Sequence, residues 1–131
     1  MPGPLTAHPW ARLLGGLPRV RGSHCRTRPG LFREWAAGLR FPDYFGHNWD
    51  AFEECLGDLL RPPGAVGPVA VLLLVTEADQ LLADEPPGQL AVLLGILDTV
   101  SASAELRVLF DTPAPALLAH RIATADGSSP R

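Results

Sequence analysis

The chain has no lysine, only two cysteines and no long hydrophobic run. Cys25 and Cys55 are too few for a disulfide framework, and their spacing matches no zinc-binding pattern. The longest purely apolar run, Val69 to Val75, covers seven residues, whereas a membrane-spanning helix needs roughly 20. The N-terminal stretch also lacks the continuous apolar segment of a secretory signal. We therefore expect a soluble cytoplasmic protein with reduced thiols that binds no cofactor, no metal and no membrane.

Positive charge is scarce in most of the chain. Residues 1–40 hold seven Arg and one Glu, whereas residues 41–131 hold four Arg and 13 acidic residues. Between Asp43 and Asp98 there are ten acidic residues and a single cation, Arg61. An acidic surface of this kind is repelled by phosphate backbones and attracted to basic surfaces. The charge pattern therefore disfavours direct binding of nucleic acid and favours a basic protein partner.

Proline and glycine divide the chain into short strands and helices. We expect an N-terminal tail over residues 1–16, one domain over residues 17–112 and a C-terminal tail over residues 113–131. The predicted strands cover residues 17–21, 69–75 and 106–110. The predicted helices cover residues 27–39, 49–60, 77–83 and 88–101.

Two of these helices carry start signals, and one strand has a distinctive composition. Thr27 and Asn48 are good N-cap residues for the first two helices. The continuous aliphatic run of the second strand predicts a strand covered on both faces. Strands separated by helices pair in parallel through right-handed crossovers. The sequence thus predicts a small α/β fold, with a three-stranded parallel sheet packed against about four helices.

The predicted helix over residues 49–60 divides into two faces at about 100° per residue. One face is apolar and comprises Trp49, Ala51, Phe52, Cys55, Leu56, Leu59 and Leu60. The other comprises Asp50, Glu53, Glu54, Gly57 and Asp58, with no cation among them. Two like-charge pairs lie at i,i+4 on this face, each costing a few tenths of a kcal/mol. A merely solvated face would be served better by mixed charges, so we interpret this one as a docking surface for a basic partner.

The segment FPDYFGHNWDAFEECL, residues 41–56, resembles the signature of the barstar family, intracellular protein inhibitors of small guanyl-type ribonucleases. The matching positions are Pro42, Tyr44, Gly46, Asn48, Asp50 and Cys55. The resemblance implies a three-stranded parallel sheet with helices against it. It also implies that the loop and the following helix enter the ribonuclease cleft, where an aromatic side chain packs over the catalytic His and carboxylates occupy the phosphate sites.

The resemblance assigns roles to individual residues. It implies that Tyr44 is the aromatic residue, Asp50 the first helix carboxylate and Glu54 the carboxylate at the phosphate-binding centre. A further family carboxylate, on the last helix, maps loosely to Asp98. Barstar itself has Asp at the position of Glu54 and Trp at the position of Glu53, so the charge at residue 54 lies one methylene further out.

Physical chemistry supports the same mode of action. Ribonucleases hold RNA phosphates with cationic side chains, so a rigid array of carboxylates can take over those charge-assisted hydrogen bonds. We expect a 1:1 complex with a small basic ribonuclease. The predicted partner-binding residues are Tyr44, Gly46, Asn48, Asp50, Glu53, Glu54, Gly57, Asp58 and Asp98.

Two other interpretations remain open. The protein could be an immunity protein for an unrelated toxin nuclease, or an acidic scaffold. It could also be a metal-dependent hydrolase that uses His47, Asp50 and Glu54 around a divalent ion. A hydrolase needs a concave site, which one exposed helix face does not provide, and a loop histidine is more often simply solvated. We also expect Phe45, Trp49 and Cys55 to be core residues.

Overall fold

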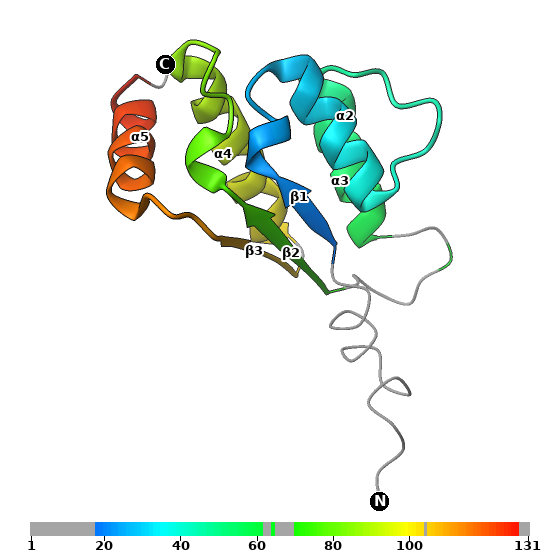
Figure 1. Cartoon of the computed structure of the whole chain (residues 1–131). Helices are drawn as coiled ribbons and strands as arrows, with labels where there is room; N and C mark the ends of the chain where they lie inside the picture. Colours follow the sequence, from blue (N-terminus) through cyan, green and yellow to red (C-terminus); the bar gives the residue numbers. More distant parts are fainter. Residues whose placement is uncertain (1–17, 62–63, 65–69, 104, 129–131) are drawn as a thin grey trace, which may run out of the picture.

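The protein is described by a computed structural model in which residues 18–61, 64, 70–103 and 105–128 are placed (Figure 1). These residues form a parallel three-stranded sheet in the order β1-β2-β3 and four α-helices, in agreement with the predicted α/β class. The elements, in chain order, are β1 (Arg19–Arg21), η2 (Gly22–His24), α2 (Arg28–Leu39), α3 (Trp49–Leu60), β2 (Val71–Thr76), η3 (Ala78–Gln80), α4 (Pro87–Ser103), β3 (Leu106–Phe110) and α5 (Pro115–Ser128).

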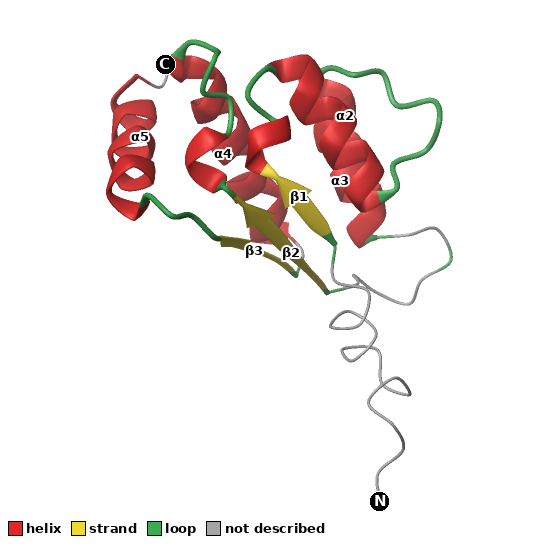
Figure 2. Ribbon diagram, viewed as in Figure 1, coloured by secondary structure: helices red, strands yellow, loops and turns green. Residues whose placement is uncertain are grey.

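The sheet buries one face against helices. Alternate residues of β2 are buried, namely Val71, Leu73 and Val75, and those between them are only partly covered. Figure 2 shows α4 passing behind the sheet, with α2 and α3 on the β1 side and α5 beyond α4. The prediction of a strand covered on both faces is therefore wrong. An aliphatic run did not distinguish a central strand with one open face from one enclosed on both sides.

The starts of α2 and α3 follow the predicted caps. The Thr27 hydroxyl accepts a hydrogen bond from the Gly30 amide at 3.2 Å. The Asn48 side-chain carbonyl accepts one from the Ala51 amide at 2.8 Å. Each bond satisfies a backbone donor that has no partner within its helix. The second of these caps fixes where the acidic helix begins.

An aromatic cluster joins α2, the following loop and α3. Phe52 lies at its centre with no exposed surface, and its ring centroid is 5.2 Å from that of Trp35 and 5.6 Å from that of Trp49. Phe32 packs edge-on to Trp49, with centroids 5.0 Å apart. Phe41 and Phe45 extend the cluster into the loop, with centroids 5.1 Å apart. The loop before α3 is thus anchored from beneath by large rings.

The segment predicted as a helix over residues 77–83 holds only the short 3₁₀ turn η3. Glu77 and Leu82 adopt left-handed backbone conformations, with φ of 51° and 54°, which a continuous helix does not allow. The Leu82 amide donates to the carbonyl of Cys25 at 2.6 Å. Hydrogen bonds to the segment after η2 thus replace those that a helix would make within itself.

The predicted C-terminal tail, residues 113–131, contains the helix α5. Leu118 and Ala125 are buried and Ile122 is partly buried, a spacing that places all three on one side of the helix. The Arg121 guanidinium donates to the carbonyl of Asp79 at 2.7 Å, which ties α5 to η3. The apolar face of α5 is short and rich in alanine, so its periodicity is weak in the sequence. The predicted N-terminal tail and residues 129–131 lie outside the described residues.

Candidate partner-binding surface

The loop over residues 41–48 presents one large hydrophobic side chain to solvent. Tyr44 is 76% exposed, whereas Phe45 is only 6% exposed. The Phe45 amide donates to the carbonyl of Pro42 at 2.9 Å, which closes the turn. With Phe41 and Phe45 packed inward on either side of it, Tyr44 projects from a loop whose base is fixed. The predicted burial of Phe45 is confirmed.

The four carboxylates of α3 form an exposed acidic face, by which we mean Asp50, Glu53, Glu54 and Asp58. None of the four makes an ion pair with any residue that the structure describes. Gly57 lies among them, and a Cβ added there would meet no atom within 4 Å. The face is therefore an uncompensated group of negative charges with open space at its middle.

The opposite side of α3 is the apolar side predicted from the sequence. Phe52, Cys55, Leu56 and Leu60 are buried. Trp49, Ala51 and Leu59 are partly buried and pack against the same core. Because the apolar side is held by the core, rotation of α3 about its axis is prevented. The acidic face consequently has a fixed orientation.

Gly46 and Asn48 shape the loop from within. The Asn48 amide nitrogen donates to the carbonyl of Gly46 at 3.2 Å, and its oxygen caps α3, so both ends of the side chain are used. A Cβ at Gly46 would lie 3.1 Å from that amide nitrogen, a tight contact. Gly46 and Asn48, which are among the predicted partner-binding residues, therefore stabilise the conformation of the loop in the structure.

The structure places Asp98 on α4 with an exposed side chain. Near the start of α4, the Gln89 side chain accepts a hydrogen bond from the Trp49 indole N–H of α3 at 2.9 Å. Asp98 follows Gln89 by nine residues, or about two and a half helical turns, so the two residues lie on opposite sides of α4. No contact described between these residues brings Asp98 together with the acidic face.

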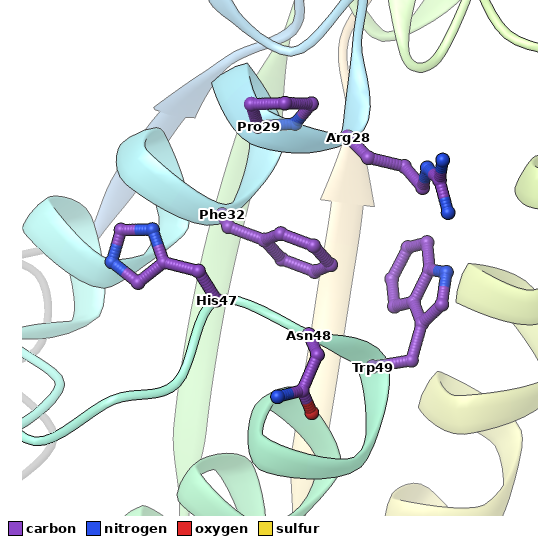
Figure 3. A pocket seen from close by; sticks show the side chains of 6 residues that line it. All are labelled: Arg28, Pro29, Phe32, His47, Asn48 and Trp49. Atoms are coloured by element: carbon purple, nitrogen blue, oxygen red, sulfur yellow. The ribbon is translucent and has the colours of Figure 1, made fainter.

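A pocket of about 300 Å³ beside the start of α3 was not predicted from the sequence (Figure 3). Its lining residues are Arg28, Pro29, Phe32, His47, Asn48 and Trp49. Half of them come from the first turns of α2 and half from the end of the loop and the first residue of α3, about twenty positions later. Only the tertiary packing of the two helix starts brings them together, and no local pattern in the sequence indicates it.

The residues of the alternative metal site do not converge. Among the described residues, no group of three or more His, Cys, Asp and Glu side chains could hold a metal ion. The His47 ring lies against Phe45, with ring centroids 4.9 Å apart. His47, Asp50 and Glu54 therefore form no shared site here.

The helices in the described part of the chain are also too short or too polar to cross a membrane.

Cys25 and Cys55 are both free and buried. Burial, and then the charge of Glu34, raises the pKa of the Cys25 thiol to about 12. Burial, and then the charges of Asp58 and Glu54, raises the pKa of Cys55. Both thiols are thus protonated near neutral pH, and a protonated thiol is a poor nucleophile.

We expect neither cysteine to react with iodoacetamide in the folded protein at neutral pH, and both to react after denaturation, as measured by intact mass. The unfolded chain releases the Cys25 proton near its usual pKa of 9.0, whereas the folded chain retains it up to about 12. The unfolded state therefore binds fewer protons between these values, so the unfolding free energy should fall as the pH rises. The fall should be shallower in Cys25→Ala. Rapid labelling of either thiol in the native protein would contradict this description.

Comparison with known proteins identifies the family. No curated protein matches the chain. The model of the Barstar family, described as barstar (barnase inhibitor), matches residues 17–111. The match covers well over half of the chain and includes every element from β1 to β3, with the loop and the acidic helix between them, but it stops before α5. The chain therefore belongs to the barstar family.

Proposed function

We propose that this protein inhibits a small, basic, guanyl-type ribonuclease by plugging its active site. The loop over residues 42–48 and the acidic face of α3 enter the cleft, and the carboxylates take the places of RNA phosphates. The complex is 1:1, because one molecule offers one such surface. The partner is the enzyme itself, and the inhibitor makes no direct contact with nucleic acid.

The observation that carries this proposal is the acidic face without internal cations. Mixed charges would stabilise an exposed helix, yet four carboxylates here repel one another and find no counter-ion among the described residues. A partner that supplies Arg, Lys or protonated His relieves this repulsion and gains charge-assisted hydrogen bonds. The family, whose description names barnase, supports a ribonuclease as that partner.

The loop supplies the second element of the proposed contact. Tyr44 is the most exposed large hydrophobic side chain in the described part of the chain, and it lies on a loop that Phe41 and Phe45 fix from below. An aromatic ring can stack on the imidazole of a catalytic histidine and pack against the floor of a cleft. Tyr44 thus adds apolar contact area beside the carboxylates, which contribute mainly charge.

The proposal is tested by measuring cleavage of RNA by barnase in the presence of increasing inhibitor. We expect complete inhibition at one equivalent, and a 1:1 stoichiometry by calorimetry. The double variant Asp50→Asn, Glu54→Gln should lose inhibition by at least about 100-fold, because two charged hydrogen-bonding groups are each replaced by a neutral one.

The matched control is Glu105→Gln, Asp111→Asn, which removes the same charge at exposed positions next to β3. This control should inhibit almost as well as the wild type. Equal loss in both double variants would show that only net charge matters and that α3 is not the inhibitory surface. Failure of the wild-type protein to inhibit barnase would favour the alternative of an immunity protein for a different toxin nuclease.

A further inference from the structure

The pocket in Figure 3 borders the proposed inhibitory surface directly. Three of its lining residues, His47, Asn48 and Trp49, immediately precede Asp50, the first carboxylate of the acidic face. Any protein that covers the start of α3 therefore also covers the pocket. The pocket differs from the acidic face in its chemistry, because it offers one cation, Arg28, and apolar walls where α3 offers carboxylates.

The walls of the pocket are apolar and rigid. Phe32 and Trp49 meet edge to face, with an interplanar angle of 77°. The indole N–H of Trp49 is already bonded to Gln89, so the ring offers only apolar surface to the pocket. Pro29 adds a further apolar group from the first turn of α2. A pocket with such walls is well suited to the aliphatic part of a side chain.

Arg28 supplies the hydrogen-bond donors of the pocket. Both ends of the Asn48 amide already make a hydrogen bond within the loop. The Arg28 guanidinium forms an ion pair with Glu85, with 3.7 Å between Nε and the carboxylate, and the same carboxylate accepts a hydrogen bond from the Arg28 amide at 2.8 Å. The Nη groups of Arg28 make no hydrogen bond to any described residue. The His47 ring lies on the other side of Phe32 from Arg28 in Figure 3. The planar guanidinium of Arg28 can still bind a second carboxylate through its Nη groups, because their N–H groups match the geometry of the two carboxylate oxygens.

The neighbouring acidic face restricts what can reach this site. A free anion such as phosphate or a nucleotide is repelled by the negative charge of the acidic face, whose first carboxylate, Asp50, directly follows the lining residue Trp49, and by Glu85, which pairs with Arg28. A carboxylate carried by a basic protein is different, because the cations of that protein are attracted to α3 and bring the carboxylate with them. The charge arrangement thus favours an acidic side chain on a basic partner.

We infer that this pocket is a second contact for the ribonuclease, and that it receives an Asp or Glu side chain from the rim of the enzyme cleft, with its carboxylate on Arg28. This inference rests on the proposed function and adds the chemistry of the partner. The four carboxylates of the acidic face attract a basic surface strongly, but they do not by themselves fix the position of that surface along α3. A contact of the opposite polarity beside them fixes the orientation, and it rejects basic proteins that have no carboxylate at that position.

The test compares Arg28→Gln with Arg33→Gln, which removes the same charge from an exposed position on α2 outside the pocket. Removing a cation from an inhibitor of a basic enzyme should by itself strengthen association or leave it unchanged. We expect Arg33→Gln to bind barnase as tightly as the wild type or slightly more tightly. Arg28→Gln should instead bind about 10-fold more weakly, mainly through faster dissociation. Arg28→Lys keeps the positive charge but lacks the two parallel N–H donors of the guanidinium, so it should recover part of the lost affinity.

The outcomes separate this inference from the proposed function. If the wild type binds barnase, and Asp50→Asn, Glu54→Gln abolishes binding while Arg28→Gln binds as tightly as Arg33→Gln, the pocket is not a contact and the inference fails alone. If the wild type does not bind barnase, both fail. Glu85→Gln controls for the lost contact of Arg28 with Glu85 and should not reproduce the weaker binding of Arg28→Gln. A double-mutant cycle completes the test. Neutralising one acidic rim residue of barnase should weaken binding of the wild type but cause no further loss of affinity in the Arg28→Gln background. If the losses of affinity are additive with Arg28→Gln at every acidic rim residue, the inference is wrong.

Discussion

Replacing Glu54 by alanine should weaken binding to the ribonuclease by about 10- to 100-fold, more than any other single change on the acidic face. Glu54 lies at the middle of that face, and the family resemblance assigns it to the phosphate-binding centre. Its removal leaves cationic groups of the enzyme buried without a partner, and an unpaired buried charge costs more than a lost surface contact. The inhibition constant measures this effect.

The same substitution should leave the melting temperature unchanged or slightly higher. Glu54 faces Asp50 and Asp58 at i,i+4, so alanine removes two repulsive pairs and introduces the best helix former. Asp50→Ala is the matched control. It should also weaken binding, but it loses a favourable interaction with the helix dipole in the first turn and should not stabilise. If Glu54→Ala inhibits as well as the wild type, the acidic face is not the inhibitory surface.

Replacing Phe52 by alanine should lower the free energy of unfolding by about 3 to 5 kcal/mol, a large part of the roughly 5 to 15 kcal/mol available to a domain. The ring is fully buried and contacts Phe32, Trp35 and Trp49. Alanine would leave a cavity between α2 and α3 that rigid neighbouring rings cannot fill. Urea denaturation followed by tryptophan fluorescence measures the change.

Glu53→Ala is the matched control for Phe52, because it alters the next residue on the exposed side of the same helix. It should change the unfolding free energy by no more than about 0.5 kcal/mol. The Phe52 variant should also inhibit poorly at temperatures where it stays folded, since the cluster beneath Tyr44 and the start of α3 is loosened. A cost below about 1 kcal/mol would mean that the cluster does not hold the loop.

The parts of the fold that were predicted correctly from the sequence depend on interactions between residues close together in the chain. Thr27 and Asn48 cap helices because their side chains reach backbone amides three residues ahead, and the structure confirms both bonds. The two faces of α3 follow from helical periodicity, and burial confirms that division. The acidic face could therefore be located from sequence alone, although its partner is still a proposal.

The features that the sequence missed depend on contacts between distant segments. The turn at η3 replaces a helix because Leu82 bonds to Cys25, 57 positions earlier. The helix α5 owes its place to a short alanine-rich face and to the bond of Arg121 with Asp79. Arg28 and Trp49 share a pocket only after α2 and α3 have packed. Neither composition nor periodicity carries such information.

Because the acidic face has no ion-pair partner among the described residues, the free protein and the proposed complex should respond to salt in opposite directions. The screening length falls from roughly 10 Å at about 0.1 M salt to roughly 3 Å at about 1 M, which is shorter than the roughly 6 Å between i,i+4 positions of a helix. Added salt therefore relieves the strain of the unbound helix while it weakens attraction to a basic enzyme. If the protein acts as proposed, its free form should be most stable at the ionic strengths where it binds least, so the acidic face would favour fast association at the expense of stability of the free chain.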